Sequence, residues 1–124
     1  MKVYTGIAAT REVRVQGPHG DMRLDEYFEV YNHSPDGFNW SYNGSGPAQL
    51  ALAILVDLFG NHEEALAVYQ QFKEQVIAQL PAGDFRLEEN QIWKVISQIR
   101  KGEPRVWPDV LDWAVEDHDA KAGT

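Results

Sequence analysis

Hydrophobic and polar residues alternate along the first third of the chain, a pattern typical of β-strands. Val3–Ile7 and Val13–Val15 are short β-branched segments, and Gly17–Gly20 indicates a turn after the second. Tyr27–Tyr31 and Phe38–Asn43 continue the pattern. Because side chains along a strand point alternately to opposite faces, these segments predict an antiparallel sheet of short strands.

The segment Phe38–Asn43 alternates strictly between aromatic and polar residues, and we expect it to pair with Tyr27–Tyr31 as a hairpin. Ser34–Gly37 between them, with the sequence Ser-Pro-Asp-Gly, suits a tight turn. The expected core face carries Phe38, Trp40 and Tyr42, and the expected polar face carries Asn39, Ser41 and Asn43. The alternative is an aromatic platform for nucleic acid bases, and the lack of Lys and Arg between Asp25 and Lys73 argues against it.

The hydrophobic pattern changes to a helical one after the first third. Pro47 suits a first helical position, and Ala48–Phe59 is apolar nearly all round, which predicts a helix buried on most sides. Gly60 is expected to end this helix. Asn61 is then expected to cap a second helix, with Glu64 three residues later in a capping-box pattern.

Three further segments complete the prediction. The second helix is expected to bury a stripe of residues, namely Leu66, Tyr69, Phe72, Val76, Ile77 and Leu80. Phe85–Leu87 is a short extended piece, Glu88–Lys101 a third helix, and residues from Pro108 to about Asp119 a possible fourth. The predicted class is α+β: an N-terminal antiparallel β-sheet of short strands followed by three to four α-helices packed on one face. Residues 1–101 form one domain and residues 102–124 an acidic C-terminal extension, which we expect to be helical.

Composition narrows the classes of function. The chain has 124 residues, no Cys, and 11 Lys and Arg against 19 Asp and Glu, for a net charge of -8. Without Cys there are no disulfides, thiol nucleophiles or thiolate metal sites. No apolar run is long enough to cross a membrane, so we expect a cytoplasmic protein. The acidic excess argues against direct binding to nucleic acid, since phosphates are bound by clustered Lys and Arg.

The turn before the first helix has two interpretations. Asn43, Gly44, Ser45 and Gly46 precede Pro47, and free N–H groups at a helix N-terminus suit a phosphate or carboxylate. The turn lacks the Lys-Ser/Thr ending of a P-loop and the three glycines of a dinucleotide fold. We therefore favour the other interpretation, in which the glycines allow close packing, with Gln49 able to cap the Gly46 N–H.

Catalytic and metal sites are poorly supported by the sequence. His33 precedes Ser34, but there is no Gly-x-Ser-x-Gly sequence and no clear orienting carboxylate. The four histidines lie in separate segments without helical metal-ligand spacing. We expect His33 or Ser34 to bond the backbone of the turn, and we predict no enzyme activity, no metal and no cofactor.

One long motif resembles a known family. Residues 33–52 fit the pattern His-Ser-Pro-x-Gly-Phe-x-Trp-x-Tyr-x-Gly-Ser-Gly-Pro-Ala-Gln-Leu-Ala-Leu, with Ser41 and Asn43 where relatives often have Gly. Residues 4–6, 69–73 and 85–87 also fit, so the likeness covers about residues 3–99. The chain thus resembles a family of small proteins from bacteria, plasmids and phages that has no assigned activity. The resemblance implies a setting of phage–host conflict.

The acidic C-terminal extension supplies the first hypothesis of function. Residues 102–124 hold two basic and six acidic residues, which is half of the net charge. An acidic amphipathic helix bearing Trp suits a basic, apolar groove, although it could equally pack on its own domain. We expect a protein that inhibits a host nucleic-acid-handling defence complex, as anti-CRISPR proteins do, by occupying a basic surface of a protein or ribonucleoprotein. The expected contacts are Trp107, Asp109, Asp112, Trp113, Glu116 and Asp117.

The second hypothesis is a small-molecule or nucleotide-signal binding protein that uses the Gly-Ser-Gly helix N-terminus. Its expected ligand-binding residues are His33, Asn39, Trp40, Asn43, Gly44, Ser45 and Gly46. A module that only assembles with itself is a third option, and a monomer and a homodimer are equally compatible with the sequence.

Overall fold

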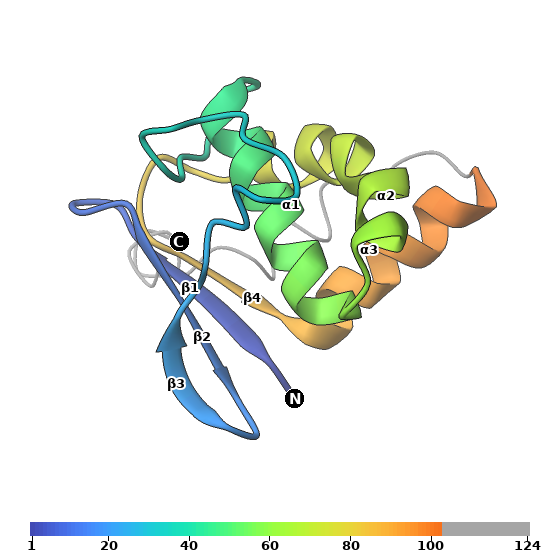
Figure 1. Ribbon diagram of the computed structural model, residues 1–124, viewed down its shortest axis with the longest axis horizontal. Helices are drawn as coiled ribbons and strands as arrows, with labels where there is room; N and C mark the ends of the chain where they lie inside the picture. Colours follow the sequence, from blue (N-terminus) through green and yellow to red (C-terminus); the bar gives the residue numbers. More distant parts are fainter. Residues whose placement is uncertain (103–124) are drawn as a thin grey trace, which may run out of the picture.

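The computed structural model describes residues 1–102 and contains a four-stranded antiparallel sheet and three α-helices (Figure 1). The predicted α+β class is confirmed. The elements, in chain order, are β1 (Val3–Ile7), β2 (Glu12–Gly17), β3 (Gly20–Arg23), α1 (Ser45–Phe59), α2 (His62–Gln75), the short 3₁₀ helix η1 (Ile77–Gln79), β4 (Phe85–Glu88) and α3 (Glu89–Lys101). The predicted fourth helix and nearly all of the acidic extension lie outside the described residues.

The strand order in the sheet is β3-β2-β1-β4. The turn predicted at Gly17–Gly20 forms, and it joins β2 to β3, a strand that the sequence did not indicate. The sheet is not wholly N-terminal, however, because β4 follows α1 and α2 and pairs antiparallel with β1. In β4 the hydrophobic residues alternate over only a few positions. The sequence therefore predicted a short extended segment there but not that this segment pairs with β1.

The glycine in β1 makes room for an aromatic ring from β4. Gly6 pairs with Val13 on one side and with Phe85 on the other. A Cβ atom on Gly6 would lie 2.2 Å from Cε2 of the Phe85 ring, which is fully buried. The ring therefore occupies the space that any side chain at position 6 would fill.

The strands predicted at Tyr27–Tyr31 and Phe38–Asn43 do not form, so this part of the prediction is wrong. The chain between Leu24 and Gly44 forms no strand. At Tyr27 the backbone has φ +57°, and the Val30 N–H bonds Tyr27 O at 3.0 Å, which is a turn. Further along, Ser41 has φ +83°. A residue in the left-handed region interrupts an extended strand.

The turn at Ser34–Gly37 does form, with the Gly37 N–H bonded to Ser34 O at 2.9 Å. It joins two irregular segments, so the predicted hairpin is wrong while its turn is right. The Ser41 N–H bonds Ile77 O at 3.0 Å, in the 3₁₀ helix η1. The backbone of Ser41 thus bonds a residue far along the chain instead of the predicted partner strand at Tyr27–Tyr31.

The predicted central helix is confirmed. In α1 every residue from Gly46 to Val56 is buried. Gly60 ends the helix with φ +68°, in the left-handed conformation that favours glycine. Asn61 caps α2, its side chain accepting the Glu64 N–H at 2.9 Å. In Figure 1, α1 runs beside the sheet, and α2 and α3 lie beyond it.

Most of the predicted stripe of α2 and η1 is buried, but Leu66 is 40% exposed. On the far side, Trp93 of α3 stacks on Phe59 of α1, with ring centroids 5.0 Å apart. Arg100 lies over the same Phe59 ring and bonds Glu64 at 3.4 Å. These contacts fix α3 against the other two helices.

Asp57 connects the sheet to α1. Its Oδ2 accepts the Tyr4 hydroxyl at 2.7 Å and the Lys2 ammonium at 3.1 Å. Burial raises the pKa of the Tyr4 phenol, and the hydrogen bond to Asp57 raises it further. Tyr4 is thus a neutral donor that holds β1 against the helix. Within residues 1–102, no helix combines the length and apolar character that a membrane crossing requires.

Candidate functional site

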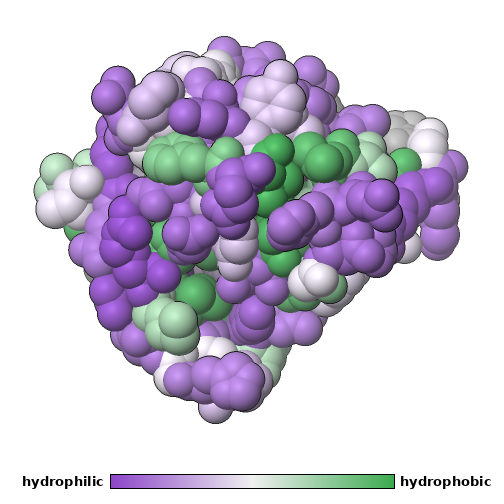
Figure 2. Space-filling model, viewed as in Figure 1, coloured by the Kyte–Doolittle hydropathy of each residue, from purple (hydrophilic) through white to green (hydrophobic). Residues whose placement is uncertain are grey.

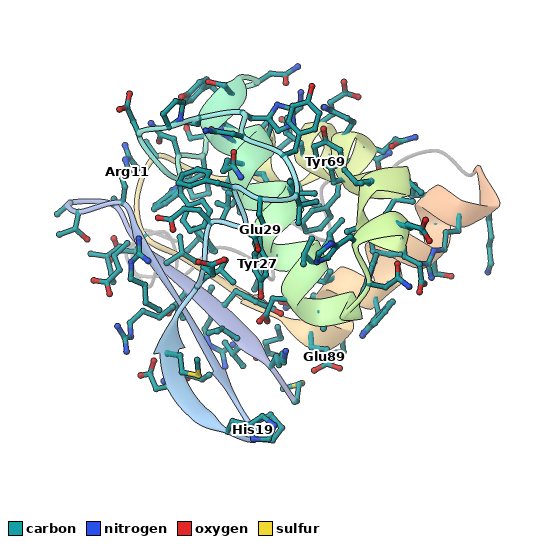
Figure 3. All side chains as sticks on the ribbon, in the orientation of Figure 1. Arg11, His19, Tyr27, Glu29, Tyr69 and Glu89 are labelled. Atoms are coloured by element: carbon teal, nitrogen blue, oxygen red, sulfur yellow. The ribbon has the colours of Figure 1, made fainter. Side chains whose placement is uncertain are left out.

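A 21-residue loop, residues 24–44, crosses α1 and forms one side of the molecule; we call it the acidic loop. It contains the carboxylates of Asp25, Glu26, Glu29 and Asp36 and no Lys or Arg. Figure 3 shows Glu29 on this loop in front of α1. Connections longer than about 15 residues are uncommon in compact domains and often carry function.

The side chain of Gln49 fixes the acidic loop to α1. It is fully buried, and its Oε1 accepts the backbone N–H groups of His33 at 2.7 Å and Ser34 at 3.2 Å. Its Nε2 donates to Glu26 O at 2.7 Å and Tyr31 O at 2.9 Å. One side chain therefore pairs four backbone groups of the loop. The prediction that Gln49 caps Gly46 is wrong.

His33 belongs to a cluster of aromatic side chains between the loop and α2. Its ring stacks on Tyr31, with centroids 4.2 Å apart, and its Nε2 lies 2.7 Å from the Tyr69 hydroxyl. That hydroxyl accepts from Gln70 at 3.0 Å, so its own proton is available to neutral His33. Burial lowers the pKa of His33 below its usual value of 6.5, and the charge of Lys73 lowers it further.

The expected role of His33 and Ser34 in bonding the turn is therefore only partly found. The Ser34 carbonyl does accept the turn hydrogen bond from Gly37. The His33 ring instead bonds Tyr69, and the backbone N–H groups of both residues bond Gln49. A nucleophile–base pair would need the His33 ring to bond the Ser34 hydroxyl. No such bond occurs in the part of the chain that the structure describes.

Two glycines at the start of α1, Gly44 at the N-cap and Gly46 in the first turn, are covered by side chains. A Cβ on Gly44 would lie 2.6 Å from the Tyr42 ring, and one on Gly46 would lie 2.6 Å from Asn39 Cβ and 3.2 Å from the Tyr42 hydroxyl. The N-cap Gly44 has no side-chain cap. Both glycines are thus explained by the close approach of loop side chains, Tyr42 to Gly44 and Asn39 to Gly46.

The aromatic residues of the motif do not share one environment. Phe38 and Trp40 are buried as predicted, whereas Tyr42 is 48% exposed, so its predicted core position is wrong. The Trp40 Nε1–H donates to Gly83 O at 2.9 Å, and its ring meets Phe85 edge-on at 4.8 Å. The expected ligand residues are accordingly spread: Asn39 contacts Gly46, Trp40 lies in the core, and Asn43 and Ser45 are exposed.

A second feature, which the sequence did not reveal, is a cleft of about 440 Å³ between the β1–β2 hairpin and the acidic loop. Its lining residues are Thr10, Arg11, Glu12, Val13, Arg23, Glu26, Asp36, Gly37 and Phe38. Short hairpin connections usually contain Gly or Asn, which adopt positive φ easily. Residues 8–11, which join β1 to β2, contain neither, and this is the sequence signal that could have drawn attention to Arg11.

Arg11 is the unusual residue of this cleft. It has φ +62° and places its guanidinium over the Trp40 ring, with Cζ 4.8 Å from the ring centroid. Its Nη1 is buried without a hydrogen-bond partner. Figure 3 shows Arg11 at the tip of the hairpin, facing the loop.

Residues 1–102 contain no group of three or more His, Asp and Glu side chains placed to hold a metal ion. The predicted partner contacts from Trp107 to Asp117 lie outside the described residues. Figure 2 shows that the face over the loop and helices is largely hydrophilic, with a band of hydrophobic residues across it.

Comparison with known proteins identifies the family. The chain belongs to a family of unknown function, DUF6166, whose model matches residues 4–98. The match includes the acidic loop, Gln49 and Arg11 and ends before the acidic extension. No curated protein and no solved structure matched the chain.

Proposed function

We propose that this DUF6166 protein is a non-enzymatic acidic binding protein that occupies a basic surface of a partner protein through its acidic loop. The observation that carries the proposal is one long loop that holds three exposed carboxylates, Asp25, Glu29 and Asp36, and no basic residue, and that makes four hydrogen bonds to Gln49. Its fourth carboxylate, Glu26, is already paired with Arg23 of β3. A fixed array of like charges steers a complementary partner and loses little conformational entropy on binding.

Exposed aromatic residues on the same loop supply anchors. Tyr31 is 53% exposed, and Phe28 and Tyr42 are also exposed. Tyr and Phe are enriched at protein interfaces, where they bury a large area around which charged groups form the rim. The stacking of Tyr31 on His33 holds one anchor in place before binding. The acidic loop therefore has both parts of a recognition surface.

We further infer the class of partner. Complexes that handle nucleic acid carry clustered Lys and Arg for phosphate contacts, and these are the basic surfaces that an acidic protein can occupy. A host defence complex of the kind that anti-CRISPR proteins inhibit fits this chemistry and the phage and plasmid setting inferred from the motif. In this proposal the acidic extension, with Trp107 and Trp113, adds contacts to those of the loop.

The test is a comparative purification from the bacterial host. The tagged protein is used as bait alongside two variants that reverse one charge each, Glu29→Lys on the acidic loop and Glu63→Lys on α2. Both glutamates are exposed, so neither variant disturbs the core. A partner that is retained by wild type and Glu63→Lys, lost with Glu29→Lys and released by high salt supports the proposal.

Two results would overturn it. Equal loss of the partner with both variants would mean that net charge alone matters. Equal retention by both variants would place the contact elsewhere on the protein.

A further inference from the structure

The backbone of Arg11, beside the cleft, has a strained conformation. Arg11 ends the β1–β2 connection with its N–H bonded to Ile7 O at 2.7 Å and with φ +62°. Gly or Asn adopts this left-handed conformation at low cost, whereas other residues are disfavoured there. Backbone strain at one residue is often retained where its side chain is needed.

The guanidinium of Arg11 is incompletely satisfied. It lies over the buried Trp40 ring, a favourable contact for a cation. Its Nη1, however, is buried and donates to no acceptor within residues 1–102. An unpaired polar atom away from water is costly, and more so on a charged group. An acceptor that reached this guanidinium would remove that cost.

The charges around the cleft are otherwise mostly paired. Glu12 bonds Arg14 at 2.8 Å, and Glu26 forms an ion pair with Arg23. Asp36 forms no ion pair or side-chain hydrogen bond in the part of the chain that the structure describes. Within residues 1–102 the cleft therefore presents a guanidinium with an unpartnered nitrogen, that of Arg11, and a carboxylate without a cation, that of Asp36.

We propose that this cleft binds a small zwitterion of the α-amino-acid type. The ligand carboxylate accepts hydrogen bonds from the Arg11 guanidinium, and the ligand ammonium pairs with the Asp36 carboxylate. Because Nη1 is covered by protein atoms, the guanidinium turns away from Trp40 as it takes up the ligand. This site shares Asp36 with the acidic loop of the proposed interface but uses none of its exposed aromatic residues, and the inference does not rest on that function.

A zwitterion suits the cleft better than either single charge. A bare anion would meet the carboxylates of Glu12, Glu26 and Asp36, and a bare cation would leave the Arg11 guanidinium unpaired. A ligand that carries both charges pairs both groups and leaves the net charge of the cleft unchanged. A volume of about 440 Å³ is ample for a free amino acid.

The experiment is an NMR titration of the full chain with L-alanine. Acetate, ethylammonium and inorganic phosphate are titrated separately as single-charge probes. We expect L-alanine to shift the amides of residues 10–13 and 36–38 and the indole N–H of Trp40, and the three single-charge probes to leave them unshifted at the same concentration. Signals that respond to acetate or phosphate as strongly as to L-alanine would overturn the proposal in favour of a simple anion site. The absence of any shift with L-alanine at high millimolar concentration would overturn it altogether.

Variants make the assignment specific. Arg11→Gln and Asp36→Asn are each expected to weaken L-alanine binding by at least about tenfold, as the loss of one charge-assisted contact implies. Arg100→Gln is the matched control, because Arg100 also lies over an aromatic ring, Phe59, but away from the cleft. Unchanged affinity in Arg11→Gln, with the dispersed amide signals of a folded chain, would contradict the proposal. Equal weakening by Arg100→Gln would do so as well.

Discussion

The side chain of Gln49 accepts the backbone N–H of His33 at 2.7 Å and so joins the acidic loop to the most buried helix of the protein. The two residues lie 16 positions apart. Because Gln49 is fully buried and pairs three further backbone groups, the loop has a fixed path despite lacking strand or helix.

Replacing Gln49 with Ala is expected to destabilise the protein and to free the loop. Four hydrogen bonds are lost and their backbone partners are left without an acceptor or donor, so we expect the free energy of unfolding to fall by about 3 kcal/mol. Urea denaturation measures this, and amide exchange of residues 31–34 should become faster. Gln71→Ala, at an exposed position of α2, is the control and should change stability by less than about 0.5 kcal/mol. Equal effects of the two variants would contradict the assigned role of Gln49.

The glycine at the start of α1 is expected to be intolerant of a methyl group. In Gly46→Ala the new Cβ would lie 2.6 Å from Asn39 Cβ, and the loop would have to shift. We expect a loss of about 2 kcal/mol by urea denaturation. Gly83→Ala is the matched control, since a Cβ there meets nothing within 4 Å. A Gly46→Ala variant as stable as Gly83→Ala would show that close packing does not explain this glycine.

Arg11→Gly is expected to stabilise the protein. Glycine adopts a φ of +62° at low cost, and the unpaired Nη1 is removed, whereas the contact with Trp40 is lost. The net gain in free energy of unfolding should be about 1 kcal/mol. Arg11→Ala removes the same guanidinium but keeps the strained backbone, so it should gain less. If Arg11→Gly were less stable than wild type, the strain at this position would be refuted.

Stability is expected to fall in weakly acidic solution because of His33. Its pKa is lower in the folded protein than the usual 6.5, chiefly through burial and then through Lys73. The unfolded chain binds a proton at His33 more readily than the folded protein does. The stability that neutral His33 contributes is therefore complete above pH 6.5, and it is lost as the pH falls through the lower pKa of the folded protein. Unfolding measured between about pH 8 and about pH 5 should show a smaller decrease in His33→Gln than in wild type. The same decrease in both proteins would rule out His33 as the cause.

The helices were predictable because their signals are local. Gly60 and Asn61 end one helix and begin the next through contacts within a few residues, and the sequence shows both. The same holds for the turn at Ser34–Gly37, which forms as predicted.

The acidic loop was predicted wrongly because its contacts are distant. The alternation of residues 38–43 indicated a strand, yet the contacts of the buried Trp40 include Gly83 and Phe85, more than 40 residues away. Tyr42 continues the alternation but covers Gly44 at the surface. Periodicity records which side chains are buried, and an anchored loop can bury alternate residues as a strand does. Nothing local in the sequence indicated the unpaired guanidinium of Arg11.

Site-specific crosslinking tests the proposed interface most directly. A photoreactive phenylalanine analogue is placed at Tyr31 on the acidic loop, and separately at Leu66 on α2, which is also exposed. In the bacterial host, we predict a crosslink to one partner protein from position 31 and none from position 66, with the partner contacting it through a Lys- and Arg-rich surface. A crosslink to that partner from position 66 alone would contradict binding through the acidic loop, as would an acidic surface at the crosslinked site of the partner.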